Sequence, residues 1–494
     1  MSLQPQYETY RYTDEIMSIP SQSIVECRLP GSEIGAILAV QAKAVPVECV
    51  CADGEVRYSG KLLLCIVYED IERKICRVER GAEFYHKAEN SIVTPACFAK
   101  TAYHIDNVTH RREGSGLYVS VILGATSRVY GGKQAEYLVG GDGVCVKTQP
   151  ATLYKTVCVS GETEGEDEFE TENVGDVLLH SETPIVTSCR AHAGQIEIEG
   201  ELNLGVCVLK ADDSICSYER LISFSMQIPC EEAFDATAVA ASVCVKSATL
   251  SAGVDEEKGK SKMVLSYALS ADCMLTTKEG LTVAADAFSP ACQLGLEKAN
   301  AGGRYLTKQL KYVERIGGAA LFSPQIEGDY ALESAVLPRA TAVCKKTEHG
   351  FEAEGVMTAE ILLRNAETGC KSTTLELPFV FPIPVEGAYA DAEFMVCGLN
   401  VRRQNGDVQA EATLKMSLRV YEEEEFSYVC AVTEGAEIPK NDAAVSIVIP
   451  RKGEDLWTLA KRLGRAPEEV QSSNPTLQFP VAEGERIIIY RQIK

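Results

Sequence analysis

The sequence has few of the residues from which common active sites are built. It holds one tryptophan and six histidines in 494 residues, and no two cysteines have the Cys-x-x-Cys spacing of zinc and redox sites. His104 and His110 flank Asp106 at a spacing that matches no standard metal site. A Gly-x-Ser-x-Gly elbow, a P-loop and a zinc-protease helix are also missing. We therefore expect no catalytic residue, no metal and no cofactor, and a binding or assembly protein rather than an enzyme.

Long apolar runs and basic charge are also scarce. No run of about eighteen apolar residues occurs, which predicts that no helix spans a membrane. The first residues, MSLQPQYETYRYTDEIM, lack the basic and apolar regions of a signal peptide, so we expect a cytoplasmic protein. Acidic residues outnumber basic ones by 71 to 48, giving a net charge of −23. Because such a chain repels a phosphate backbone, we expect no nucleic-acid partner.

The 19 cysteines mostly lie inside apolar, strand-like runs, such as those around Cys65, Cys207 and Cys244. This placement favours reduced thiols that act as small buried hydrophobic residues. Oxidative cross-linking in a maturing assembly is the alternative.

Three segments share one pattern of alternating residues, a glycine, and a second alternating run. They are EVRYSGKLLLCIVY with Gly60, QIEIEGELNLGVCVL with Gly200, and GFEAEGVMTAEILL with Gly355. A phenylalanine follows each glycine at the same spacing of 24 residues, namely Phe84, Phe224 and Phe379. Three equal spacings indicate an internal repeat. Such a glycine typically marks a bulge or a close backbone approach, and the phenylalanines are expected to be core anchors.

Each repeat closes with another alternating run, over residues 117–130, 263–276 and 408–421. Period-two alternation predicts half-buried strands, so we expect a mainly β fold of three tandem β-sandwich-like repeats. We place these repeats at residues 1–150, 172–295 and 330–437.

Two segments fall between the predicted repeats. The acidic run 161–176 is expected to be a solvated, self-repelling connector or an exposed strand edge. Residues 294–329 are expected to join the second and third repeats, with a helix or a docking segment in part of this stretch.

The last fifty residues, 445–494, differ from the rest in charge and pattern. They carry eight basic and six acidic residues, whereas residues 1–444 carry 40 and 65. Strands are expected at 446–450 and 485–490. Between them we predict a helix at 456–463, with Asp455 as its N-cap and Gly464 at its C-terminal end, and a second helix from Pro467 to about 473. The result is a small βααβ module.

These patterns resemble known families. The module is similar to LysM in the ordered positions Gly453, Glu454, Leu456, Trp457, Ala460, Asn474, Pro475, Gly484 and 487–489. The glycine, strand and phenylalanine pattern resembles the SPOCS domain, formerly a domain of unknown function, of spore-coat morphogenetic proteins. Tandem copies followed by LysM are similar to the SipL-type proteins.

The LysM resemblance implies recognition of glycans that contain N-acetylglucosamine, in a groove between two loops. Here these loops are 452–456 and 474–479. The candidate binding residues are therefore Lys452, Gly453, Glu454, Asp455, Asn474, Pro475, Thr476, Leu477, Gln478 and Phe479. We interpret Trp457 as a core or core-edge residue rather than a sugar platform.

The SipL-type resemblance implies a spore-coat scaffold on the mother-cell side of the forespore surface. Its LysM module would dock on a coat-basement morphogenetic ATPase or another coat protein. The alternative is a peptidoglycan-binding protein of the cell wall or spore cortex. Self-association through the edge strands of the β repeats is a further expectation.

Overall fold

The computed structural model describes residues 3–30, 34–114, 116–172, 174–235, 237–255, 260–323, 330–404, 407–439, 443, 445–482 and 484–490. Strands dominate this part of the chain, and its helices are two short ones near the C-terminus. The expectation of a mainly β fold is confirmed. None of the described helices is long and apolar enough to cross a membrane.

The strands before the C-terminal module form three units. The first unit contains β1 (Gln4–Pro30), β2 (Ile34–Ala52), β3 (Glu55–Asp70), β4 (Ile75–Glu89), β5 (Phe98–Glu113) and β6 (Gly116–Asp142). The second contains β7 (Cys145–Glu172), β8 (Val174–His192), β9 (Gln195–Lys210), β10 (Ile215–Pro229), β11 (Ala238–Asp255) and β12 (Lys260–Phe288). The third contains β13 (Cys292–Ala319), β14 (Leu321–Ser323), β15 (Ala331–Thr347), β16 (Gly350–Asn365), β17 (Gly369–Ile383), β18 (Tyr389–Gln404) and β19 (Asp407–Glu437).

All three units have the same sheet topology. The first, last and last-but-one strands form one sheet, in the orders β1-β6-β5, β7-β12-β11 and β13-β19-β18. The middle strands form the other sheet, in the orders β2-β3-β4, β8-β9-β10 and β15-β16-β17, with β14 added beside β17. Each unit buries a large apolar cluster to which both of its sheets contribute. The repeated β arrangement expected from the sequence therefore appears as three equivalent two-sheet units.

The repeated glycines and phenylalanines lie opposite each other on neighbouring strands. The pairs are Gly60 with Phe84, Gly200 with Phe224, and Gly355 with Phe379. All three phenylalanines are buried. A Cβ atom on Gly200 would lie 2.1 Å from the Phe224 ring and 2.6 Å from the carbonyl oxygen of Ile185 on β8. In the first two units the spacing of 24 residues thus places a core ring over a glycine that has no room for a side chain, whereas at Gly355 the neighbouring strand β15 leaves no room.

The two predicted connectors are in fact strands. Most of the acidic run 161–176 belongs to β7, an outer strand of its sheet that pairs with β12, so the strand-edge alternative is correct and the solvated connector is wrong. Its glutamates at alternate positions are exposed. Residues 292–319 form β13 and pair with β19, so no helix occurs there; residues 324–329 lie outside the described residues. Both segments are ordered by pairing with strands that are distant in the sequence, β12 and β19. Local composition cannot reveal such partners, so the prediction from composition failed.

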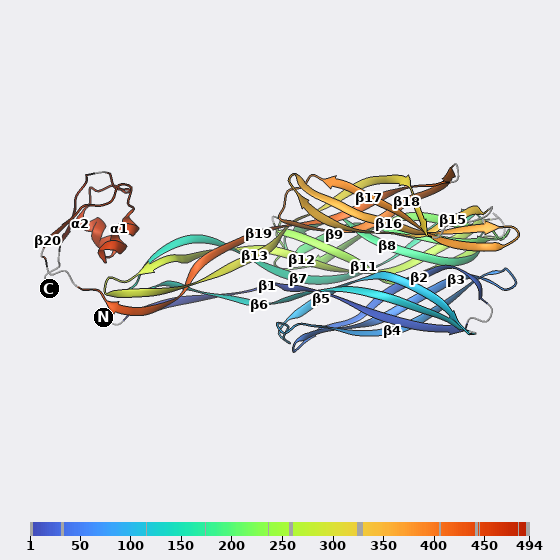
Figure 1. Ribbon diagram of the computed structural model, residues 1–494, viewed down its shortest axis with the longest axis horizontal. Helices are drawn as coiled ribbons and strands as arrows, with labels where there is room; N and C mark the ends of the chain where they lie inside the picture. Colours follow the sequence, from blue (N-terminus) through green and yellow to red (C-terminus); the bar gives the residue numbers. More distant parts are fainter. Residues whose placement is uncertain are drawn as a thin grey trace.

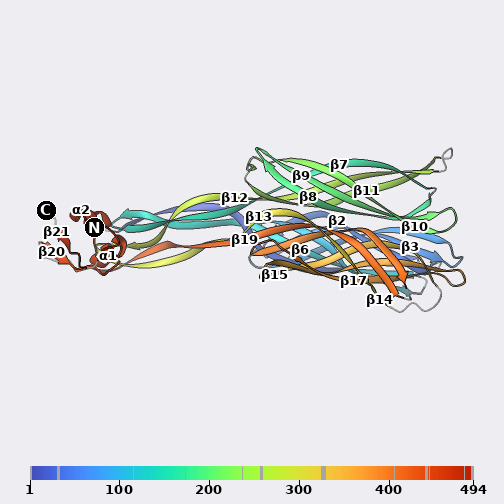
Figure 2. The ribbon, with the colours of Figure 1, turned by 90° about the horizontal axis from the view of Figure 1, so that it is seen from above.

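The first and last strands of each unit are 27 to 31 residues long and extend beyond the end of the third strand of their sheet. Beyond Tyr130, for example, β6 pairs with β1 alone, because β5 begins opposite that residue. Each unit therefore extends a two-stranded ribbon. Figure 1 shows the three ribbons leaving the three units together as a stalk, with the N-terminus near its tip. Figure 2 shows the same stalk after a quarter turn.

The stalk has an apolar interior to which all three ribbons contribute. One cluster combines Tyr12, Ala135 and Tyr137 of the first ribbon, Leu153 and Val283 of the second, and Ala301 and Tyr428 of the third. A second cluster combines Leu138, Ala284, Ala287 and Val429. Since a lone two-stranded ribbon is only marginally stable in water, this shared interior is what holds the ribbons in place.

A charged network joins the three units where the stalk begins. Asp391 of β18 accepts hydrogen bonds from Arg128 of the first unit and, at 2.7 Å, from Arg419 of β19. Arg419 also donates to Ser242 of the second unit. Ser242 in turn donates to Glu393 at 2.6 Å. Burial opposes ionisation of Asp391, but the two guanidinium groups outweigh it and lower the pKa of this carboxyl.

We predict that Gly200→Ala destabilises the protein by about 2–3 kcal/mol, because the new methyl group must displace a core ring and a backbone carbonyl. Chemical denaturation measures the change. Gly280→Ala in the same unit is the matched control, since nothing lies within 4 Å of a Cβ atom there. Equal stabilities of the two variants would contradict the proposed close approach.

We predict that Asp391→Asn costs about 1.5–3 kcal/mol, because it removes the carboxylate that accepts charged hydrogen bonds from the half-buried Arg128 and Arg419. The free energy of unfolding measures this loss. The exposed Asp53→Asn serves as the control and is expected to change stability by less than about 0.5 kcal/mol. A neutral Asp391→Asn would show that the network does not hold the units together.

Candidate functional site: the C-terminal module at the stalk tip

The C-terminal module has the strand, helix, helix, strand order expected from its sequence. It consists of β20 (Val445–Val448), α1 (Leu456–Leu463), α2 (Pro467–Ser473) and β21 (Ile487–Tyr490). The Asp455 carboxylate caps α1 by accepting from the backbone N–H of Thr458 at 2.7 Å. Gly464 ends the helix in the left-handed conformation, with φ of 62°. Strands β20 and β21 pair antiparallel, with Val448 opposite Ile487.

The first candidate loop, 452–456, is joined to the segment that follows the second loop, 474–479. The Gly453 N–H donates to the carbonyl of Val481 at 3.0 Å, and the Val481 N–H donates to the carbonyl of Glu454 at 3.1 Å. Around this junction Lys452, Gly453, Pro475, Thr476 and Gln478 are exposed. These five residues are the part of the candidate set that a ligand could reach.

Two candidate residues are held inside the module. Glu454 is buried and forms a two-pronged ion pair with Arg462, at 2.9 and 2.8 Å. The hydrogen bonds from Arg462 lower the pKa of this carboxyl, so Glu454 is a charged structural brace. The Asn474 side chain bonds the backbone of Val470 and, through both its oxygen and its nitrogen, that of Ile488. Asn474 therefore ties α2 to β21.

The remaining candidates are partly committed to the fold as well. Asp455 is the helix cap and lies 3.3 Å from the Lys147 ammonium of β7. Leu477 and Phe479 are half-buried and pack against the apolar cluster that the module shares with Phe288 of the stalk. The loop thus presents a polar surface, because its apolar side chains turn toward the core.

The module docks on the second ribbon of the stalk, through contacts that sequence reasoning missed. The Trp457 indole packs edge-on against Phe288, with ring centroids 5.0 Å apart, and donates to Asp286 at 2.8 Å. Lys461 donates to both oxygens of the same carboxylate, at 2.6 and 2.7 Å. Burial disfavours the charge on Asp286, but these hydrogen bonds prevail and lower its pKa. Trp457 is therefore an interface residue between module and stalk.

In the part of the chain that the structure describes, no three His, Cys, Asp or Glu side chains gather as a metal site would require. All 19 cysteines are free, six of them buried and one, Cys244, exposed. Burial raises the pKa of the Cys207 thiol to about 12, which keeps it protonated near neutral pH.

Comparison with protein-family models, with curated proteins and with solved structures gives no match to this chain. Its function must therefore be inferred from its residues and their arrangement.

We predict that Asp286→Ala and Phe288→Ala each release the module from the stalk. Because Trp457 is the sole tryptophan, its fluorescence reports this contact directly. Loss of the ring contact and of the hydrogen-bond acceptor is expected to shift the emission to longer wavelength, as the indole becomes solvated. Asp142→Asn, an exposed change in the first ribbon, should leave the emission unchanged. Unshifted spectra in both docking variants would refute the docked arrangement.

Proposed function

We propose that the protein is a non-enzymatic scaffold of the spore coat or spore envelope. Its module is a LysM unit that docks on a coat-basement protein, such as a morphogenetic ATPase, at the forespore surface. The observation that carries this proposal is the display of the module at the tip of the stalk, away from the three units (Figures 1 and 2). A scaffold needs its anchoring module to stand apart from its three units, because the module must reach a surface that the units do not touch.

The outer face of the module's two-stranded sheet supports a protein partner. Val445, Ile447 and Ile449 alternate along this chain segment and are 52%, 65% and 71% exposed. Tyr490 lies opposite Val445 and is 56% exposed. A cluster of exposed apolar side chains on so small a sheet is typical of a protein–protein contact.

The mother-cell cytosol is the compartment that this proposal requires. A LysM unit retained there meets proteins rather than peptidoglycan, which favours docking on a coat protein. The strongly acidic body, at a net −25 over residues 1–444, is compatible with this role because it disfavours adhesion to nucleic acid.

The second candidate is binding of N-acetylglucosamine glycans of the cell wall or cortex. The observation that favours it is the exposed polar loop surface of Lys452, Thr476 and Gln478, which lies where the LysM resemblance locates the glycan groove. The two candidates use different faces of one small module, so substitutions can separate them.

We predict that affinity purification from sporulating cells recovers coat proteins with the full chain but not with a chain that ends before residue 445. The three units complete their sheets by Glu437, so this truncation removes only the module. Ile447→Ser with Ile449→Ser should lower recovery as strongly as the truncation does, because the apolar contact is lost.

Thr476→Ala with Gln478→Ala is the matched loop variant, and it should recover coat proteins normally. Purified sacculi provide the opposing arm of the experiment. Saturable binding to sacculi that the loop variant abolishes, without recovery of coat proteins, would reject the scaffold in favour of the glycan-binding protein. Unaltered spore coats after deletion of the gene would reject the scaffold independently.

A further inference from the structure

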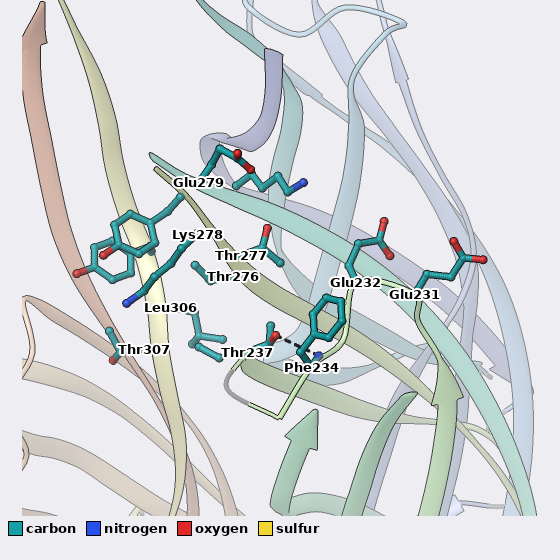
Figure 3. Close-up of a pocket in the computed structure, with 14 residues that line it drawn as sticks. Glu231, Glu232, Phe234, Thr237, Thr276, Thr277, Lys278, Glu279, Leu306 and Thr307 are labelled. Carbon is teal, nitrogen blue, oxygen red and sulfur yellow. Dashed lines mark hydrogen bonds between the residues drawn. The ribbon is translucent and has the colours of Figure 1, made fainter. Parts of the chain in front are cut away.

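A cavity of about 830 Å³ lies at the boundary between the second and third units, where their ribbons enter the stalk. Its walls come from β7, β12, β13, the first residue of β11 and residues 231, 232, 234 and 237 before it (Figure 3). This volume is within the range of small-molecule and side-chain pockets, roughly 300–1,000 Å³.

The cavity coincides with a difference among the repeats. The first residue of β5 is Phe98, which lies opposite Tyr130 and stacks on it with ring centroids 5.2 Å apart. The first residue of β18 is Tyr389, which lies opposite Tyr421 at 5.7 Å. Two of the three units thus place an aromatic pair at the start of this strand.

The second unit has small residues at the equivalent position. Its strand β11 begins with Ala238, which lies opposite Thr276, and both residues line the cavity. Where the sister units have two rings, the second unit has a methyl group and a threonine. The place that an aromatic side chain fills in the first and third units is therefore left open here.

The walls of the cavity suit an aromatic guest. Tyr154 of β7 and Tyr305 of β13 stack face to face, with centroids 3.5 Å apart and planes 2° from parallel. Phe234 lies on another side of the cavity and is 60% exposed (Figure 3). Rings on two sides provide apolar surface for a third.

The polar groups at the edge of the cavity add one requirement. Glu231 and Glu232 are exposed at the edge, beside Phe234 (Figure 3). Although Lys155 and Lys278 also line the cavity, the two carboxylates favour a cationic group at this edge, next to the ring.

We propose that this cavity binds a tyrosine or phenylalanine side chain of a partner protein, from a segment in which a basic residue flanks the aromatic one. The aromatic ring occupies the position that the sister units fill from their own sequence. The basic neighbour pairs with Glu231 or Glu232. The site lies on the body of the protein and is independent of the module at the stalk tip.

The test titrates the full chain with the peptide acetyl-Arg-Tyr-Arg-amide and, in parallel, with acetyl-Arg-Ala-Arg-amide, by isothermal titration calorimetry. Tyrosine should strengthen binding about tenfold or more over alanine, since the two peptides carry the same charge. Ala238→Phe, which restores the ring found in the sister units, should weaken binding of the tyrosine peptide about tenfold. Glu232→Gln should weaken it about threefold, as expected for an exposed ion pair.

Thr249→Phe, an exposed change on the same strand β11, is the matched control and should leave the affinity unchanged. Thermal unfolding checks that each variant is folded; Ala238→Phe should unfold no earlier than the wild type, because the other two units accommodate a ring at this strand position. Equal binding of the two peptides, or an Ala238→Phe variant that binds normally, would overturn the proposal. So would binding of N-acetylchitotriose, removed by Ala238→Phe, in place of peptide binding.

Discussion

The stalk depends on one physical constraint, which is that a two-stranded ribbon cannot bury enough apolar surface to be stable alone. Each unit extends such a ribbon beyond its third strand, and each ribbon carries one apolar face. Packing three of them around a common axis buries all three faces at once. The three units must then lie side by side in one orientation, as the shared cluster of Leu38, Leu178 and Val336 in the body also requires. A repeat of three therefore produces one assembled body rather than a string of separate domains.

The charged network around Asp391 lies where the two-sheet units pass into the ribbons. Its hydrogen bonds join residues of all three units there. Apolar packing sets no unique register between ribbons, whereas hydrogen-bonded charge pairs tolerate little displacement. We interpret the network as the element that fixes how the units are aligned. At the tip of the stalk, Trp457 and Lys461 likewise donate hydrogen bonds to a carboxylate, that of Asp286. These bonds set the orientation of the module.

Much of this architecture could be predicted from local patterns. The spacing of 24 residues revealed three repeats because it reflects cross-strand pairing of Gly60 with Phe84 and of its two equivalents. Both helices of the module followed from Asp455, Gly464 and Pro467, since capping is a local property. The ribbons could not be predicted, because an acidic strand such as β7 is ordered only by its distant partner β12. Likewise, nothing local distinguishes Glu454 and Asn474, which brace the module, from the exposed loop residues Thr476 and Gln478.

Small-angle X-ray scattering of the full chain tests the central claim, that three ribbons form a rigid stalk with the module at its tip. Strands of 27 to 31 residues extend on the order of 90–100 Å. The predicted result is a rod with a maximum dimension above about 100 Å, which shortens when residues 445–494 are removed. A compact particle with a radius of gyration near 23 Å, the value for a globular chain of this length, would contradict the account.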